Sequence, residues 1–157
     1  MLTSSFLCDS PEQTGQLGKI IGEKAMPGDV WSLSGPLGAG KTLWVKGFAQ
    51  GLGVDSTVTS PTFTLQHIYQ GRLSLYHFDW YRLERAQEVE DLGFSEWTER
   101  GGVVAVEWGN KYPGMLPPNA IRLQFETLGP QSRRIIVEAD HPETIPRIEE
   151  LVRCWPP

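Results

Sequence analysis

The hydrophobic pattern of the first third of the chain predicts a helix, a strand and a second helix. Ser10 followed by Pro11 and an acidic first turn is typical of a helix N-terminus, and apolar residues at helical spacing extend this helix to about Met26. The apolar run 30–34 predicts a strand, and the amphipathic run 43–52 predicts the next helix. This part of the chain therefore has the alternating order of an α/β protein.

The middle of the chain predicts a β-hairpin followed by short helices. Residues 63–69 and 73–78 have strand-like patterns, and Gln70-Gly71-Arg72 between them has the composition of a turn. The acidic segment 84–99 predicts one or two short helices. We expect four apolar residues in or directly before this segment to be buried, namely Leu83, Leu92, Phe94 and Trp97.

The last third predicts one buried strand and a late antiparallel pair. Residues 103–106 form a nearly continuous apolar run, which is typical of a strand covered on both faces. Residues 121–125 and 134–137 flank a Gly129-Pro130 turn, and 142–154 predicts a terminal helix. Hairpin strands added to an alternating α/β order imply an α/β fold with a mixed, partly antiparallel central sheet.

Composition narrows the class of protein. A chain of 157 residues with 39% hydrophobic and 21% charged residues predicts a single domain spanning 1–157. No apolar stretch approaches the ~20 residues of a membrane helix, and no signal peptide is visible, so we expect a cytoplasmic protein without a membrane partner. The net charge of −5 argues against DNA binding and against more than an indirect link to RNA. Cys8 and Cys154 match no metal-ligand spacing and predict free thiols.

A phosphate-binding loop follows the first predicted strand. The pattern G-x-x-x-x-G-K-[ST] is complete, and its glycines allow backbone N–H groups to surround a phosphate. The lysine of the pattern would contact the β- and γ-phosphate oxygens, and the threonine would offer its hydroxyl to Mg²⁺. The expected nucleotide-binding residues are Gly35, Pro36, Leu37, Gly38, Ala39, Gly40, Lys41 and Thr42. This pattern predicts a nucleoside triphosphate binder with a P-loop NTPase-like three-layer fold.

Two acidic residues end predicted strands, where a metal-dependent phosphate site needs carboxylates. Asp79 follows the strand at 73–78, and Glu107 follows the buried strand at 103–106. One can serve Mg²⁺ while the other orients or deprotonates the attacking water. The alternative is that either acid caps a helix or pairs with Arg82 or Arg85.

Three further positions have weaker signals. Thr62 in Ser60-Pro61-Thr62 lies where a nucleotide switch would sense the γ-phosphate, although the segment is also compatible with an ordinary turn. Trp108 can pack against a nucleotide or belong to the core. His67 and His77 have no metal-ligand spacing, so we interpret both as structural.

Four sequence blocks together resemble the TsaE (YjeE) family of small bacterial ATPases. The resemblance extends over nearly the whole chain. The blocks are Leu37-Gly38-Ala39-Gly40-Lys41-Thr42, Thr59-Ser60-Pro61-Thr62-Phe63, Tyr76-His77-Phe78-Asp79-Trp80-Tyr81-Arg82-Leu83 and Val106-Glu107-Trp108. Pro36 stands where an acidic residue is common in the family, and Gly109 follows Trp108 where proline is frequent.

This resemblance implies a Mg²⁺-dependent ATPase, binding ATP and ADP, that acts in forming threonylcarbamoyladenosine beside the tRNA anticodon. In that family a TsaD–TsaB pair transfers the threonylcarbamoyl group, and TsaE supports turnover by binding the pair and hydrolysing ATP. The resemblance makes Lys41 and Thr42 phosphate and Mg²⁺ contacts. It makes Asp79 the catalytic aspartate and Glu107 the second acidic, Mg²⁺-associated residue. Thr62 falls in the switch-like loop, and Trp108 matches an aromatic residue near the nucleotide.

Other phosphate-loop functions remain open from the residues alone. A small-molecule kinase would need an arginine-rich lid, which the chain does not display. A GTPase-like switch is suggested by Asn110-Lys111, but Pro113 replaces the aspartate that would bind guanine. A binding protein without hydrolysis would not need both Asp79 and Glu107.

Overall fold

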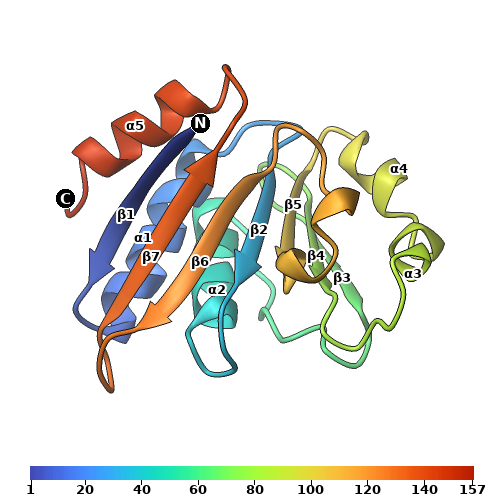
Figure 1. Cartoon of the computed structure of the whole chain (residues 1–157), viewed down its shortest axis with the longest axis horizontal. Helices are drawn as coiled ribbons and strands as arrows, with labels where there is room; N and C mark the ends of the chain where they lie inside the picture. Colours follow the sequence, from blue (N-terminus) through green and yellow to red (C-terminus); the bar gives the residue numbers. More distant parts are fainter.

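A seven-stranded mixed sheet runs through the computed structural model, which describes residues 1–157 (Figure 1). The strand order is β1-β7-β6-β2-β5-β4-β3. The strands are β1 Leu2–Cys8, β2 Val30–Ser34, β3 Gln66–Tyr69, β4 Leu75–Asp79, β5 Val103–Glu107, β6 Ile121–Thr127 and β7 Arg133–Ala139. The helices are α1 Pro11–Lys24, α2 Lys41–Gly51, α3 Gln87–Asp91, α4 Phe94–Thr98 and α5 Ile145–Arg153, with 3₁₀ turns η1 Gly109–Lys111 and η2 Pro113–Met115.

The sheet combines a parallel centre with antiparallel edges, as the sequence predicted. Strands β4, β5, β2 and β6 pair in parallel, so their carboxyl ends meet at one edge. Pairing is antiparallel between β3 and β4, between β6 and β7, and between β7 and β1. The predicted hairpin and the predicted late strand pair therefore supply the two antiparallel parts.

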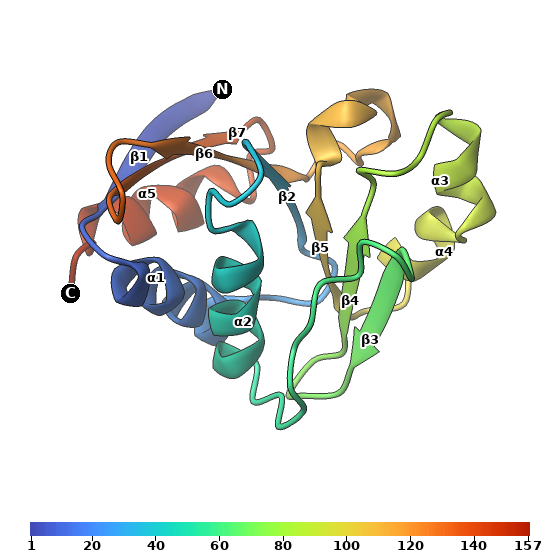
Figure 2. The same cartoon turned by 90° about the horizontal axis from the view of Figure 1, so that it is seen from below.

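Helices cover both faces of the sheet, but unequally (Figure 2). On one face, α1, α2 and α5 enclose the larger core, where the rings of Trp44 and Phe48 stack with centroids 4.9 Å apart. On the other face, α3 and α4 cover the β4 and β5 side, where Phe94 packs edge-on against Phe78 and Trp80. The longest helix has 14 residues, and no helix is both long and apolar enough to cross a membrane.

Helices α1 and α2 approach each other until their backbones touch. A Cβ atom on Gly18 would lie 2.2 Å from the carbonyl oxygen of Trp44, and one on Gly47 would lie 2.0 Å from that of Gly15. Both positions therefore exclude every residue except glycine. This close packing fixes the start of α2, and with it the end of the phosphate loop.

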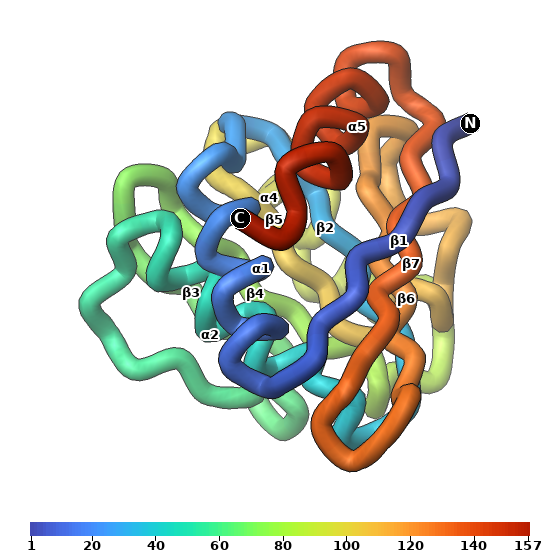
Figure 3. Tube along the Cα trace, turned by 90° about the vertical axis from the view of Figure 1, so that its left-hand side faces the viewer, coloured from blue at the N-terminus to red at the C-terminus, as the bar shows by residue number.

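Several elements differ from the sequence prediction. Strand β1 was not predicted, because its only buried side chains are Phe6 and Cys8 and its partner β7 lies at the far end of the chain (Figure 3). The strand predicted from residue 63 begins only at Gln66, and Phe63 is 82% exposed. Of the four positions expected to be buried around the short helices, Leu83 and Phe94 are buried, whereas Leu92 and Trp97 are half-buried.

Candidate functional site

The predicted site residues meet at the carboxyl ends of the central strands. The phosphate loop follows β2, Asp79 is the last residue of β4, and Glu107 is the last residue of β5. Asp79 and Glu107 are also paired in register across β4 and β5. These residues line a pocket of about 430 Å³ together with the loop residues 37–42 and with Thr62 and Trp108. Gly35 and Pro36 form the start of the same loop but do not line the pocket.

The glycines of the phosphate loop are required by its backbone. Gly35, Gly38 and Gly40 have φ angles of 138°, 77° and 103°, a region in which side chains other than hydrogen are strained. A Cβ atom on Gly35 would also lie 2.7 Å from the carbonyl oxygen of Phe125. Helix α2 begins directly after Gly40, so the peptide N–H groups of its first turn face the pocket end of the helix.

Lys41 is held at the start of α2 by the loop itself. Its Nζ donates hydrogen bonds to the carbonyl oxygens of Gly35 at 2.6 Å and Pro36 at 2.9 Å, and it lies 4.4 Å from the centre of the Trp108 ring. Burial lowers the pKa of the Lys41 ammonium, while the nearby carboxylates of Glu107 and Asp79 oppose that shift. The side chain is thus a buried cation beside the expected phosphate position.

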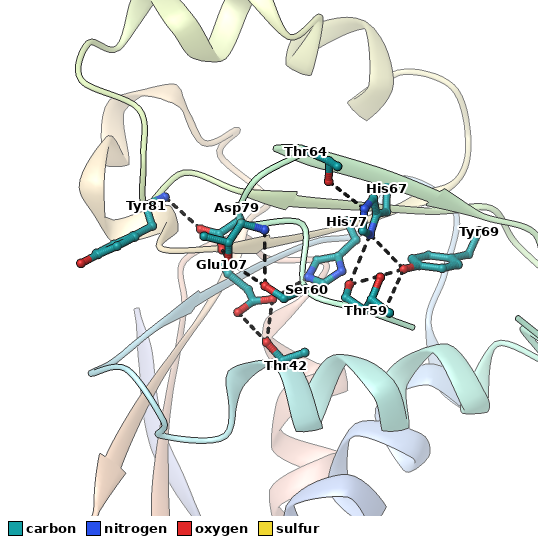
Figure 4. A network of polar contacts seen from close by, with 11 residues as sticks. Thr42, Thr59, Ser60, Thr64, His67, Tyr69, His77, Asp79, Tyr81 and Glu107 are labelled. Atoms are coloured by element: carbon teal, nitrogen blue, oxygen red, sulfur yellow. Dashed lines mark hydrogen bonds and ion pairs between the residues drawn. The ribbon is translucent and has the colours of Figure 1, made fainter. Parts of the chain in front are cut away.

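Thr42, Glu107 and His77 form a chain of hydrogen bonds across α2, β5 and β4 (Figure 4). The Thr42 hydroxyl lies 3.1 and 3.2 Å from the two carboxylate oxygens of Glu107, and the Nε2 of His77 lies 2.7 Å from Oε2. His77 is fully buried. The absence of metal-ligand spacing predicts a structural role for His77, and the structure places its ring directly against Glu107. The available signal was its position two residues before Asp79, on the same face of the strand.

Asp79 is held by two donors from different segments. The backbone N–H of Tyr81 donates to Oδ1 at 2.9 Å, and the Thr62 hydroxyl donates to Oδ2 at 2.9 Å. The hydroxyl groups of Thr62 and Ser60 are 2.7 Å apart. Burial raises the pKa of the Asp79 carboxyl, and the two hydrogen bonds partly offset this shift. Asp79 therefore links the Ser60-Pro61-Thr62 segment to the sheet.

The alternative arginine pairing of the acids is absent. Arg82 lies over the ring of Phe63 at 5.0 Å, and Arg85 pairs with Glu88. Neither arginine forms an ion pair with Asp79 or Glu107, whose carboxylates instead face the pocket. Both acids therefore line the pocket without an arginine partner, and their roles there remain predictions.

Trp108 lines the pocket and has an unusual backbone conformation. Its φ angle is 62°, and its ring lies 4.9 Å from that of Tyr81. Its backbone N–H donates to the carbonyl oxygen of Leu33 at 2.7 Å, which fixes the residue to the end of β2. Non-glycine residues in such sparsely populated backbone conformations cluster at functional sites.

His67 lies outside the pocket. Its ring contacts the Thr64 hydroxyl at 2.7 Å and the Tyr69 hydroxyl at 3.1 Å, both within the β3 region. This arrangement agrees with the structural interpretation made from the sequence.

Sequence reasoning missed the contribution of the β6–β7 hairpin. Gln131 and Arg133 line the pocket, and the Nε of Arg133 donates to the carbonyl oxygen of Ala39 in the phosphate loop at 2.9 Å. No motif connects residues 94 positions apart in the sequence. The contact arises only because β6 pairs with β2 and brings the hairpin to the loop.

The residues present fit a magnesium ion bound together with phosphate. The Thr42 hydroxyl and the Glu107 carboxylate are hard oxygen ligands within hydrogen-bonding distance of each other. Mg²⁺ takes few protein ligands and completes its shell with phosphate oxygens and water. The chain has no cluster of three or more His, Cys, Asp or Glu ligands of the kind that suits zinc.

The segment that resembled a guanine-binding motif has a structural role. The Lys111 ammonium donates to the carbonyl oxygens of Tyr81, at 2.7 Å, and of Leu83. The Tyr112 hydroxyl also donates to Leu83, at 2.8 Å. Lys111 therefore fixes the segment after β4 and does not line the pocket.

Comparison with known proteins gives a consistent family assignment. Residues 8–136 match the family model described as threonylcarbamoyl adenosine biosynthesis protein TsaE. The TsaE protein of Bacillus subtilis is 44% identical over 131 residues, covering 83% of this chain and 82% of its own length. That of Treponema pallidum is 41% identical over 128 residues, covering 82% and 95%. The crystal structure of Bacillus subtilis YdiB superposes with a TM-score of 0.80 at 35% identity, covering 97% of this chain and 95% of that one.

Proposed function

The chain belongs to the TsaE family, whose members act in the biosynthesis of threonylcarbamoyladenosine in tRNA, and we propose that it is the magnesium-dependent ATPase of that pathway. The observation that supports this proposal best is the meeting of Lys41, Thr42, Asp79 and Glu107 in one pocket at the end of the parallel strands. The set provides one cation for phosphate, one metal-binding pair and one further carboxylate. These are the parts that hydrolysis of a nucleoside triphosphate requires.

The phosphate loop would bind the polyphosphate of ATP or ADP. The N–H groups at the start of α2 and the helix dipole favour negative charge at this point. Lys41 would exchange its contacts with the carbonyl oxygens of Gly35 and Pro36 for contacts with the β- and γ-phosphates. Binding by backbone N–H groups and one lysine explains how an acidic chain accommodates a highly charged ligand.

Thr42 and Glu107 would hold Mg²⁺. When bound, the ion would neutralise the charge that develops on the phosphate oxygens. His77 keeps the Glu107 carboxylate directed at Thr42, because its hydrogen bond of 2.7 Å leaves the carboxylate little freedom to rotate. The chain thus supplies an oriented pair of oxygen ligands beside the phosphate loop.

Asp79 would orient or deprotonate the attacking water. Thr62 would contact the γ-phosphate and so distinguish ATP from ADP. Burial favours the neutral form of Asp79, so its carboxylate is more basic than an exposed one. The Thr62 hydroxyl bonded to Asp79 links this acid to the Ser60-Pro61-Thr62 segment. If the Thr62 hydroxyl donated to a γ-phosphate, it would give up its hydrogen bond to Asp79. Nucleotide binding would then alter both the position of the Ser60-Pro61-Thr62 segment and the hydrogen bonding of Asp79.

The site alone would hydrolyse ATP slowly and would be completed by the TsaD–TsaB pair. The pocket is open to solvent beside exposed Leu37 and Tyr81, and the one arginine that lines it, Arg133, is bonded to backbone carbonyls. No lid from this chain excludes water from the γ-phosphate end. The net charge of −5 also favours an indirect relation to tRNA through the partner pair.

Measured ATP hydrolysis tests this proposal directly. We expect slow release of phosphate by the protein with Mg²⁺, and faster release when the TsaD–TsaB pair is added. Lys41→Ala should remove both activities, which controls for a contaminating ATPase. Hydrolysis that the pair does not change, together with no complex in the presence of ATP, would contradict the partner assignment. Transfer of phosphate to a small molecule in place of water would favour a kinase.

A further inference from the structure

Arg133 connects the β6–β7 hairpin to the outer side of the phosphate loop. Its Nε donates to the carbonyl oxygen of Ala39 at 2.9 Å, and its Nη2 donates to that of Gly38 at 3.4 Å. Its Nη1 donates to the carbonyl oxygens of Gly129 and Ser132, both at 2.9 Å. One guanidinium group therefore ties the hairpin to the loop through the backbone of each.

The two loop carbonyls belong to consecutive peptide groups, those joining residues 38–39 and 39–40. In a trans peptide the C=O and N–H bonds point in opposite directions. A carbonyl held toward Arg133 therefore turns the N–H of the following residue away from it. The Ala39 N–H is bonded to the carbonyl oxygen of Pro36 at 3.2 Å, while the Gly40 N–H has no acceptor in the chain, and Gly40 lines the pocket.

The charge of Arg133 is not neutralised by an acid. All its hydrogen bonds go to backbone carbonyls, and none of the ion pairs of the structure includes it. A guanidinium group stays protonated at any ordinary pH. It therefore adds a permanent positive charge to a pocket that also contains the carboxylates of Asp79 and Glu107.

We propose that Arg133 is a positioning residue that shapes the phosphate loop before nucleotide binds. By holding the carbonyls of Gly38 and Ala39 outward, it directs the Gly40 N–H toward the site of the phosphate. The inference rests on the proposed nucleotide-binding function and adds a residue to it. The guanidinium group is essential, because its three nitrogens contact four backbone carbonyls at once, two on the loop and two on the hairpin, whereas an ammonium group has only three N–H donors at one point.

Calorimetric titration with ADP, without Mg²⁺, tests the role of the fork. Arg133→Met removes the donors and the charge, whereas Arg133→Lys keeps the charge. Arg134→Met is the matched control, because Arg134 is the next residue of β7, exposed, and on the opposite face of the strand. We expect both Arg133 variants to bind ADP roughly tenfold or more weakly, as loss of a charged hydrogen bond implies, and Arg134→Met to bind as wild type.

Amide hydrogen exchange separates positioning from general stability. The Ala39 N–H should exchange faster in Arg133→Met by a larger factor than the amides of β5, whose exchange follows global stability. Wild-type affinity in both Arg133 variants, or full rescue by Arg133→Lys, would overturn the inference. Arg133→Lys decides the question if Arg133→Met does not fold. Failure of the wild type to bind ADP would instead refute the proposed function.

Discussion

Asp79 and Glu107 face each other in register at the ends of the parallel strands β4 and β5. Their side chains leave the sheet on the same side, since paired residues of adjacent strands share a face. Each has a different set of donors: Asp79 bonds to Thr62 and the Tyr81 backbone, and Glu107 bonds to Thr42 and His77. Two neighbouring carboxylates with different partners are suited to two different tasks.

Glu107→Gln should reduce ATP hydrolysis by roughly 10²-fold, because an amide is a much weaker Mg²⁺ ligand than a carboxylate. Binding of ADP without Mg²⁺ should remain close to wild type, since the phosphate loop is unchanged. Phosphate release across a Mg²⁺ titration and calorimetry with ADP in a chelator measure the two effects. Full activity at every Mg²⁺ concentration would show that Glu107 is structural.

Asp79→Asn should lower hydrolysis but raise the stability of the nucleotide-free protein at about pH 7. Burial raises the pKa of Asp79 in the folded state above its ordinary value of 3.8, so the unfolded chain ionises first as the pH rises. The free energy of unfolding therefore decreases as the pH rises from the pKa of Asp79 in the unfolded chain to its higher pKa in the folded protein. It stays at this lower value at higher pH. The gain from the neutral asparagine should shrink as the pH falls toward about 4.

Urea denaturation at several pH values measures this gain, with the exposed Asp55→Asn as the control. A gain that does not depend on pH would contradict the assignment to Asp79 ionisation. Hydrolysis by the wild type should also fall as the pH decreases through the raised pKa, because the base must be ionised.

Thr62→Val should weaken the preference for ATP over ADP. The valine keeps the shape of the side chain but cannot hydrogen-bond to Asp79 or to a γ-phosphate. Calorimetry with ADP and a non-hydrolysable ATP analogue gives the ratio of the two affinities. Thr64→Val is the matched control, since Thr64 is exposed and bonds to His67 outside the pocket. An unchanged ratio in Thr62→Val would remove this residue from the site.

Lys41→Ala should weaken ADP binding by about 10- to 100-fold, because it removes the one lysine that lines the pocket. Lys46→Ala on the exposed side of α2 should bind ADP as wild type does. Calorimetry on the two variants makes the comparison. Equal affinities in both would contradict the assignment of the phosphate loop.

Cys154 should react with iodoacetamide in the native protein, and Cys8 should not. Both thiols are free, but Cys8 is buried, and burial raises its pKa to about 11. Mass spectrometry after labelling should therefore find one modified cysteine in buffer and two in urea. Cys154→Ser should abolish the fast reaction, and rapid labelling of that variant would mean that Cys8 is accessible.

Local features of the fold could be predicted from the sequence. Strand β2 was predicted with its observed bounds, and helices α1 and α2 with small errors at their ends, because their periodicity and their turn residues act within a few positions. The shape of the loop at 35–42 could be anticipated for the same reason, since its glycines are required by backbone angles within a few residues. Asp79 and Glu107 could be placed at one edge of the sheet because each ends a recognisable strand.

Contacts between distant segments were decided by the tertiary structure. Strand β1 is stabilised by pairing with β7, and the sequence pattern of residues 2–8 alone does not predict that pairing. His77 reaches Glu107, and Arg133 reaches Ala39, only because neighbouring strands bring these residues together. A sequence pattern contains the preferences of each segment, but the direction of a side chain into a shared site depends on which strands the sheet places side by side.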